Sequence, residues 1–284
     1  MSARSRGLPP RPITRTPEPG AREILAQIRT LFRYRALIES LVSRELKARY
    51  RASVLGFVWS FVNPLLQLLT YGIVFGYFLP VQRPKEMEPY LLFFACGILP
   101  WSFFEAAVLE ASTVLVSSGG LLKKVLFPPE ILPTVSVITN LFNFLLSLPI
   151  LLFFVVWNHR LSPWAFLSVL PLLVQLVLAL GLALALSALT VHFRDLSNII
   201  GHLFRLWFFG SPILYVYGAT EGRLRDLLRV NPMSHIIVSY QQTLFEGRFD
   251  HWAGLGAAAL VALTVFGFGC FLFDRLRDAL AEEL

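Results

Sequence analysis

The sequence predicts an all-α integral membrane protein with six transmembrane helices and both termini in the cytosol. Hydrophobic residues make up 56% of the 284 residues and charged residues only 15%, whereas soluble domains carry about 25% charge. The apolar residues gather into stretches long enough to cross a bilayer, which takes roughly 20 helical residues. Most of the 25 Lys and Arg residues flank those stretches, as is typical of membrane proteins. This placement explains the net charge of +7 without nucleic acid as a partner.

The first 30 residues are rich in Pro and Arg. They lack the 7–15-residue apolar core of a signal peptide, so we expect a disordered cytosolic tail. Residues 31–284 then form one transmembrane domain.

An amphipathic helix is predicted over residues 33–51, before the first span. Its apolar ladder is Ile38, Val42, Leu46 and Tyr50, and its opposite side is basic. A helix lying on the membrane surface and a solvated helix both fit this pattern. Glu45 and Arg49 project onto the apolar side and, being four residues apart, could pair with each other.

Six apolar stretches of sufficient length follow the amphipathic helix. The predicted spans cover residues 54–79, 90–116, 131–157, 163–191, 196–217 and 252–273. The fifth is the weakest, because Arg205, Gly210 and Pro212 interrupt it. A continuous helix and two half-helices that dip in and out both fit there. Residues 218–251 form a polar segment with short helical patches before the last span.

The positions of the basic residues set the orientation. Of the 25 Lys and Arg residues, 17 fall on the side of the termini, 7 on the other side and Arg205 within a span. The cytosolic side of a membrane protein carries the excess. We therefore expect both termini inside and the segment 218–251, a helical region, on the outer face.

Two motifs resemble one family. Residues 44–64 read RELKARYRASVLGFVWSFVNP, and residues 127–133 read FPPEILP after a turn rich in Gly and Lys. These segments resemble permease subunits of type-two ABC transporters. The branch is the one that exports O-antigen of lipopolysaccharide, capsule polysaccharide or teichoic acid. The resemblance covers about residues 33–280.

The resemblance implies a homodimeric permease of the bacterial inner membrane. Two copies of a separate ATP-binding cassette subunit would bind ATP and Mg²⁺. The implied substrate is a polysaccharide on undecaprenyl diphosphate. A type-two exporter for drugs or lipids and a membrane-embedded glycan or lipid transferase are the alternatives. For the transferase, His192 and Asp195 are the only nearby pair at a cytosolic span end.

The resemblance also places an ATPase-coupling interface on the amphipathic helix and on the turn 118–130. The residues are Arg44, Lys47, Arg49, Tyr50, Arg51, Ser118, Gly119, Gly120, Lys123, Lys124, Pro128 and Glu130. Prolines would stiffen the turn as a lever, although a plain interhelical loop also fits. The chain needs such a partner, because no Gly is followed by Lys as in a phosphate-binding loop. We expect a transport subunit with no catalytic residues of its own.

Charges and aromatic residues within the spans are candidates for a substrate pathway. Charges there are costly and often functional, and an aromatic face offers sugars weak C–H contacts. The candidates are Tyr71, Tyr77, Phe103, Phe104, Glu105, Arg205, Trp207, Phe208 and Tyr215. A structural pair between a Glu and Arg205 is equally open, and Glu110 is expected to snorkel to the interface. Trp101 and other tryptophans near span ends fit an interfacial belt. The five scattered His predict no metal site.

Overall fold

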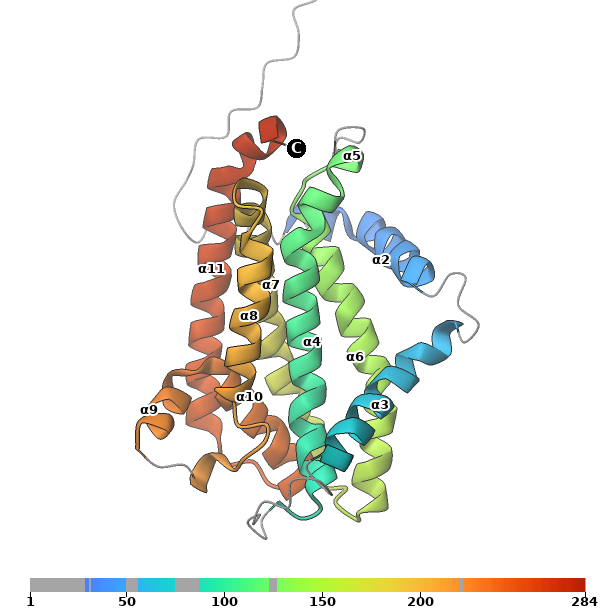
Figure 1. Ribbon diagram of the computed structural model, residues 1–284, viewed down its shortest axis with the longest axis vertical. Coiled ribbons are helices and arrows are strands. Elements are labelled where there is room, and N and C mark those ends of the chain that lie inside the picture. The colour runs from blue at the N-terminus through green and yellow to red at the C-terminus, as the bar shows by residue number, and fades with distance from the viewer. Residues whose placement is uncertain are drawn as a thin grey trace, which may run out of the picture.

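A computed structural model describes residues 29–30, 32–49, 56–74, 87–122, 127–219 and 222–283. These residues form helices and some of the turns between them, with no strand among them (Figure 1). The predicted all-α class is therefore confirmed. Nearly all of the predicted N-terminal tail lies outside the described residues. So do five of the predicted site residues, namely Tyr50, Arg51, Tyr77, Lys123 and Lys124.

Among the described residues, four helices are long and apolar enough to cross a membrane. They are α4 (Tyr90–Ser117), α6 (Ile131–Trp157), α7 (Val169–His192) and α11 (Trp252–Glu283). A 3₁₀ turn, Pro163–Ser168, leads directly into α7. These helices match the second, third, fourth and sixth predicted spans. The last span and the charged tail after it form one continuous helix.

The other two predicted spans contain shorter helices. A 3₁₀ turn at Gly56–Val58 precedes α3, which covers Trp59–Ile73, and α8 covers Leu196–Phe209. At 1.5 Å per residue they extend about 22 and 21 Å, less than the roughly 30 Å of bilayer hydrocarbon. Part of the first span lies outside the described residues. The six-span count therefore stays a prediction.

The fifth predicted span is helical only as far as Phe209, and Asn231 explains the turn that follows. The Asn231 amide donates to the carbonyl oxygen of Gly210 at 2.8 Å and to the hydroxyl of Ser211 at 3.1 Å. Its Oδ1 accepts from the Trp207 indole at 2.8 Å and from the Met233 backbone at 2.9 Å. One side chain thus ties the end of α8 to the start of α10 (Pro232–Gln241).

The segment between α8 and α11 is only partly polar. It contains a 3₁₀ turn at Tyr217–Ala219, α9 (Gly222–Val230), α10 (Pro232–Gln241) and a π-helical turn at Gln242–Glu246. Every residue of α10 from Met233 to its end is buried. It is inserted at one end of the bundle, where it packs against α4, α7 and α11.

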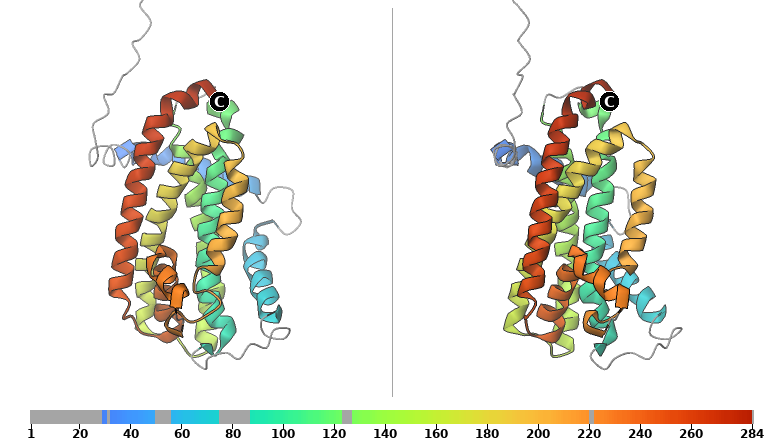
Figure 2. Two further views of the ribbon diagram at one scale, coloured as in Figure 1. Left: turned by 60° about the vertical axis from the view of Figure 1, so that its left-hand side comes forward. Right: turned by 90° about the vertical axis from the view of Figure 1, so that its left-hand side faces the viewer.

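The core runs along α4, which packs against α6 and α7, while α7 packs along α11 (Figure 2). Two glycines allow a close approach of α7 to α11. A Cβ on Gly181 would lie 2.6 Å from the Phe266 backbone, and one on Gly269 would lie 2.2 Å from the Gly181 carbonyl oxygen. The absence of side chains at both positions brings the two backbones into contact.

The connections divide between the two ends of the bundle. The short helices α2 (Arg35–Arg49) and α5 (Gly119–Leu122) lie at the end where α11 finishes (Figure 1). The α9 and α10 helices lie toward the other end. Trp157 and Trp252 are exposed at span ends, as a belt residue would be. Trp101 is only 1% exposed, so its assignment to the belt was wrong: it packs in the core.

Candidate functional site

Helix α2 lies across the bundle at the end that also carries α5 (Figure 2). Its apolar residues Ile38, Leu41 and Val42 are buried in one cluster with residues of α4, α6, α7 and α11. The membrane-surface interpretation was therefore wrong about this face, because protein covers it. Burial of this face holds α2 on the bundle.

A polar cluster joins the end of α2 to two long helices. Arg49 Nη2 donates to Glu110 Oε2 on α4 at 2.7 Å, and Arg49 Nη1 donates to Asn140 Oδ1 on α6 at 3.4 Å. The Asn140 amide also donates to Glu110 Oε2 at 2.7 Å and to the Ser136 carbonyl oxygen at 2.9 Å. Glu110 is thus held by two helices while 40% of its side chain stays exposed, and the expectation that it snorkels to the interface stays a prediction.

Glu45 lies beside this cluster. It accepts a hydrogen bond from the Thr139 hydroxyl at 3.4 Å, whereas Arg49 is turned toward Glu110. The predicted pairing of Glu45 with Arg49 is thus replaced by contacts to α4 and α6. Burial and then the negative charge of Glu110 raise the pKa of Glu45, which Arg49 partly opposes.

The remaining coupling candidates divide by exposure. Arg44, Lys47 and Gly120 are exposed, Ser118 and Pro128 are half-buried, and Gly119 is buried. Glu130 is also buried, with its Oε1 3.9 Å from Arg277 Nη1 on α11. Glu130 therefore orients the start of α6 against α11, and the exposed residues are the ones available to a partner.

Three of the aromatic candidates, Phe104, Trp207 and Phe208, belong to one aromatic cluster. Trp101 and Phe104 of α4 contact Phe204, Trp207 and Phe208 of α8. The ring centroids of these contacts lie 5.3–6.1 Å apart, within the range of favourable aromatic pairs. This aromatic cluster fastens α8 to α4.

The other aromatic candidates lie elsewhere. Phe103 is buried against Phe144 of α6, and Tyr71 of α3 contacts Phe94. The Tyr215 hydroxyl donates to the Phe209 carbonyl oxygen at 3.0 Å. A role in contacting substrate stays a prediction for all of these residues.

The charged candidates belong to a polar stripe formed by Gln67, Ser102, Glu105 and Arg205. Gln67 of α3 and Ser102 of α4 are hydrogen-bonded at 2.9 Å. Glu105 accepts from the Trp101 indole at 3.2 Å, and Arg205 of α8 is exposed within electrostatic reach of it. The two charges form no direct ion pair within the described ranges. Sequence reasoning missed Gln67 and Ser102, since neutral polar residues in a span give only a weak signal.

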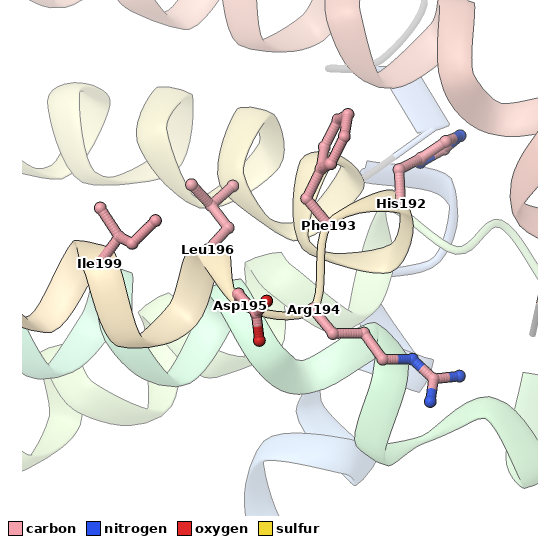
Figure 3. A pocket seen from close by; sticks show the side chains of 6 residues that line it. All are labelled: His192, Phe193, Arg194, Asp195, Leu196 and Ile199. Carbon is pink, nitrogen blue, oxygen red and sulfur yellow. The ribbon is translucent and has the colours of Figure 1, made fainter.

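A hollow of about 460 Å³ lies at the turn between α7 and α8 (Figure 3). Its lining includes His192 and Asp195, the pair on which a transferase would depend. Their side chains point in different directions, and His192 Nδ1 lies 3.1 Å from the Ala188 carbonyl oxygen. No cluster of three metal-ligating side chains occurs in the described part of the chain. This geometry does not favour the transferase.

A histidine pair joins α10 to the start of α11. His235 Nε2 lies 2.9 Å from the Arg229 carbonyl oxygen, so it carries the proton. His235 Nδ1 then accepts from His251 Nε2 at 2.8 Å, and the Tyr217 ring contacts both imidazoles. Burial and then the neighbouring His235 lower the pKa of His251 to about 4.

This histidine pair predicts a stability that depends on pH. The ordinary pKa of His is about 6.5, so between pH 6.5 and 4 the unfolded chain binds a proton that folded His251 does not. Stability from this site is complete above pH 6.5 and is lost as the pH falls toward 4. We expect the melting temperature of the purified protein to fall more between pH 7.5 and 5 than that of His251→Gln, which keeps an N–H donor. His202→Gln, at an exposed position, should match the wild type. An equal decrease in the melting temperature of the wild type, His251→Gln and His202→Gln would contradict the assignment of this pH dependence to His251.

Comparisons with known proteins match most of the chain to transport proteins. Residues 36–245 match the family described as ABC-2 type transporter. The chain is 38% identical over 260 residues to the O-antigen export system permease protein RfbA of Myxococcus xanthus, covering 90% of this chain and 98% of that relative. It is 26% identical to the protein of the same name from Klebsiella pneumoniae, over 87% and 95% of the two chains. It is 21% identical to the polysialic acid transport protein KpsM of Escherichia coli, over 86% and 94%.

Proposed function

This chain belongs to the ABC-2 type transporter family, and we propose that it is the transmembrane permease subunit of a bacterial polysaccharide exporter. The observation that carries the proposal is the 38% identity to an O-antigen export permease across 98% of that relative. A permease named for polysialic acid transport also aligns over 94% of its length. These relatives favour a polysaccharide over the drug or lipid substrates of other exporters.

The substrate we propose is an O-antigen-like polysaccharide on an undecaprenyl diphosphate carrier. The greater identity to O-antigen permeases than to the polysialic acid protein supports this class. The chain would move the glycan from the cytosolic to the outer leaflet of the inner membrane. Six spans and two cytosolic termini fit this task.

Two copies of a separate ATP-binding cassette subunit would supply the energy. The exposed residues Arg44, Lys47 and Gly120 lie at the bundle end that we assign to the cytosol. They would contact that subunit, together with Tyr50, Arg51, Lys123 and Lys124. ATP and Mg²⁺ would be bound by the partner.

A homodimer would enclose the substrate pathway. The polar stripe Gln67, Ser102, Glu105 and Arg205 is only partly covered within one chain. Polar and charged groups facing hydrocarbon are costly, so a second copy packed beside α3 and α8 would shield them and form a wet path between the protomers. Tyr71, Trp207 and Tyr215 are half-buried close to this side.

Deletion of the gene in its own host tests the proposed function. Lipid-linked polysaccharide should accumulate inside the cell, and surface polysaccharide should fall to background. The wild-type gene should restore export, whereas it should fail in a strain whose partner ATPase cannot hydrolyse ATP. Surface polysaccharide that persists unchanged after deletion would refute the assignment.

A further inference from the structure

One residue predicted to contact the ATPase is bonded to the bundle, although 31% of its side chain stays exposed. Arg49 is the last residue of α2 and directs its guanidinium to Glu110 and Asn140. While these bonds are made, Arg49 is committed to α4 and α6. These bonds give Arg49 a route to act on coupling through those helices.

The two kinds of contact that hold α2 differ in how strictly they depend on geometry. The hydrophobic attraction of Ile38, Leu41 and Val42 to the bundle has no preferred direction. The Arg49–Glu110 ion pair is a charge-assisted hydrogen bond, which needs close alignment. At 2.7 Å it fixes the end of α2 to one point of α4, and Asn140 bonded to both partners holds that point against α6.

From Glu110 the central helix leads directly to the proposed pathway. Glu105 lies five residues away on α4, about 7.5 Å along the axis. It accepts from Trp101, whose ring contacts Phe204, Trp207 and Phe208 of α8. A shift of α2 that pulls on Glu110 would thus reach the helices that carry the polar stripe.

We propose that Arg49, Glu110 and Asn140 form a latch that transmits motion of α2 to α4. They are positioning residues, and the inference rests on the proposed function. The latch makes α2 a lever with a fixed attachment, so that ATP-driven movement at the cytosolic end changes the position of α4 and, through the aromatic cluster, of α8.

The test uses the permease together with its ATP-binding subunit in lipid vesicles. The variants are Arg49→Met, Glu110→Gln and the double variant, with Arg49→Lys to keep the charge. Arg35→Met is the matched control, since Arg35 is exposed on the same helix and lies outside the proposed contact with the ATP-binding subunit. Assembly, ATP hydrolysis without substrate, and polysaccharide moved per ATP hydrolysed are measured for each.

We expect each single variant to lower transport per ATP about tenfold, with assembly intact and ATP hydrolysis within about twofold of wild type. The double variant should be no worse than either single one, because all three break one interaction. Arg49→Lys should recover part of the coupling, and Arg35→Met should behave as wild type. Unchanged transport per ATP, or a loss due to failed assembly in every variant, would overturn the latch.

A second measurement separates the latch from the substrate assignment. Hydrogen exchange of residues 101–109 of α4 should change when ATP is added to the wild-type complex, with no glycan present. This response should disappear in Arg49→Met and persist in Arg35→Met. If the response depends on Arg49 in this way while no polysaccharide is moved, the proposed function fails and the latch stands. If polysaccharide is moved and the response persists in Arg49→Met, the latch fails alone.

Discussion

Alanine in place of Gly181 or Gly269 should strongly reduce the amount of folded protein. A Cβ at Gly181 would lie 2.6 Å from the Phe266 backbone, and one at Gly269 would lie 2.2 Å from the Gly181 carbonyl oxygen. Backbone atoms cannot turn away as a flexible side chain can, so α7 and α11 would have to separate. Overpacking a well-packed core typically costs about 1–3 kcal/mol, and the loss of the α7–α11 contact would place these variants at or above the upper end.

Gly256 provides the matched control on α11 itself. A Cβ there meets no atom within 4 Å, and alanine favours a helix by about 1 kcal/mol over glycine. Gly256→Ala should therefore melt at or above the wild-type temperature in detergent. The monodisperse yield and the melting temperature of the three variants test whether the α7–α11 contact excludes a Cβ at these positions. Wild-type values for Gly181→Ala would show that the two helices do not meet at these glycines.

Trp101→Ala should produce the second large effect. The Trp101 side chain is 1% exposed and contacts four aromatic rings. Truncation of a buried Trp costs about 3–5 kcal/mol, and it would also remove the indole hydrogen bond to Glu105. We expect a large drop in melting temperature and faster hydrogen exchange in α8, since the aromatic cluster fastens that helix to α4.

Two further tryptophan variants separate burial from hydrogen bonding. Trp101→Phe keeps most of the ring packing and loses the N–H donor, so its melting temperature should lie between those of wild type and Trp101→Ala. Trp157 is 71% exposed at the end of α6, and Trp157→Ala should have little effect on stability in detergent. If Trp101→Ala and Trp157→Ala melted alike, the aromatic cluster would not be a major contributor.

The sequence was sufficient to locate the long helices, because their apolar length is a local property. The third predicted span, residues 131–157, coincides with α6. The end of α8 depended on a tertiary contact instead. Asn231 lies more than 20 residues from the Gly210 carbonyl that it binds, and no local pattern indicates that partner.

The candidate site shows the same difference between local sequence patterns and tertiary contacts. The helical repeat placed Arg49 on the apolar side of its helix, but it could not show that Glu110 and Asn140 would meet it there. For Trp101, nearness to a predicted span end suggested an interface, whereas neighbours on α8 bury it. Periodicity describes one helix at a time, and the partner on each face is set by how the helices assemble.

The insertion of α10 has a geometric consequence for the whole bundle. Ile236, Ile237 and Tyr240 are at most 2% exposed and fill the space between α4, α7 and α11. Since protein interiors are packed nearly without voids, the volume of these side chains fixes how far apart the long helices stand at that end. The inserted helix therefore works as a spacer, and a larger or smaller residue on it would alter the splay angle of the bundle.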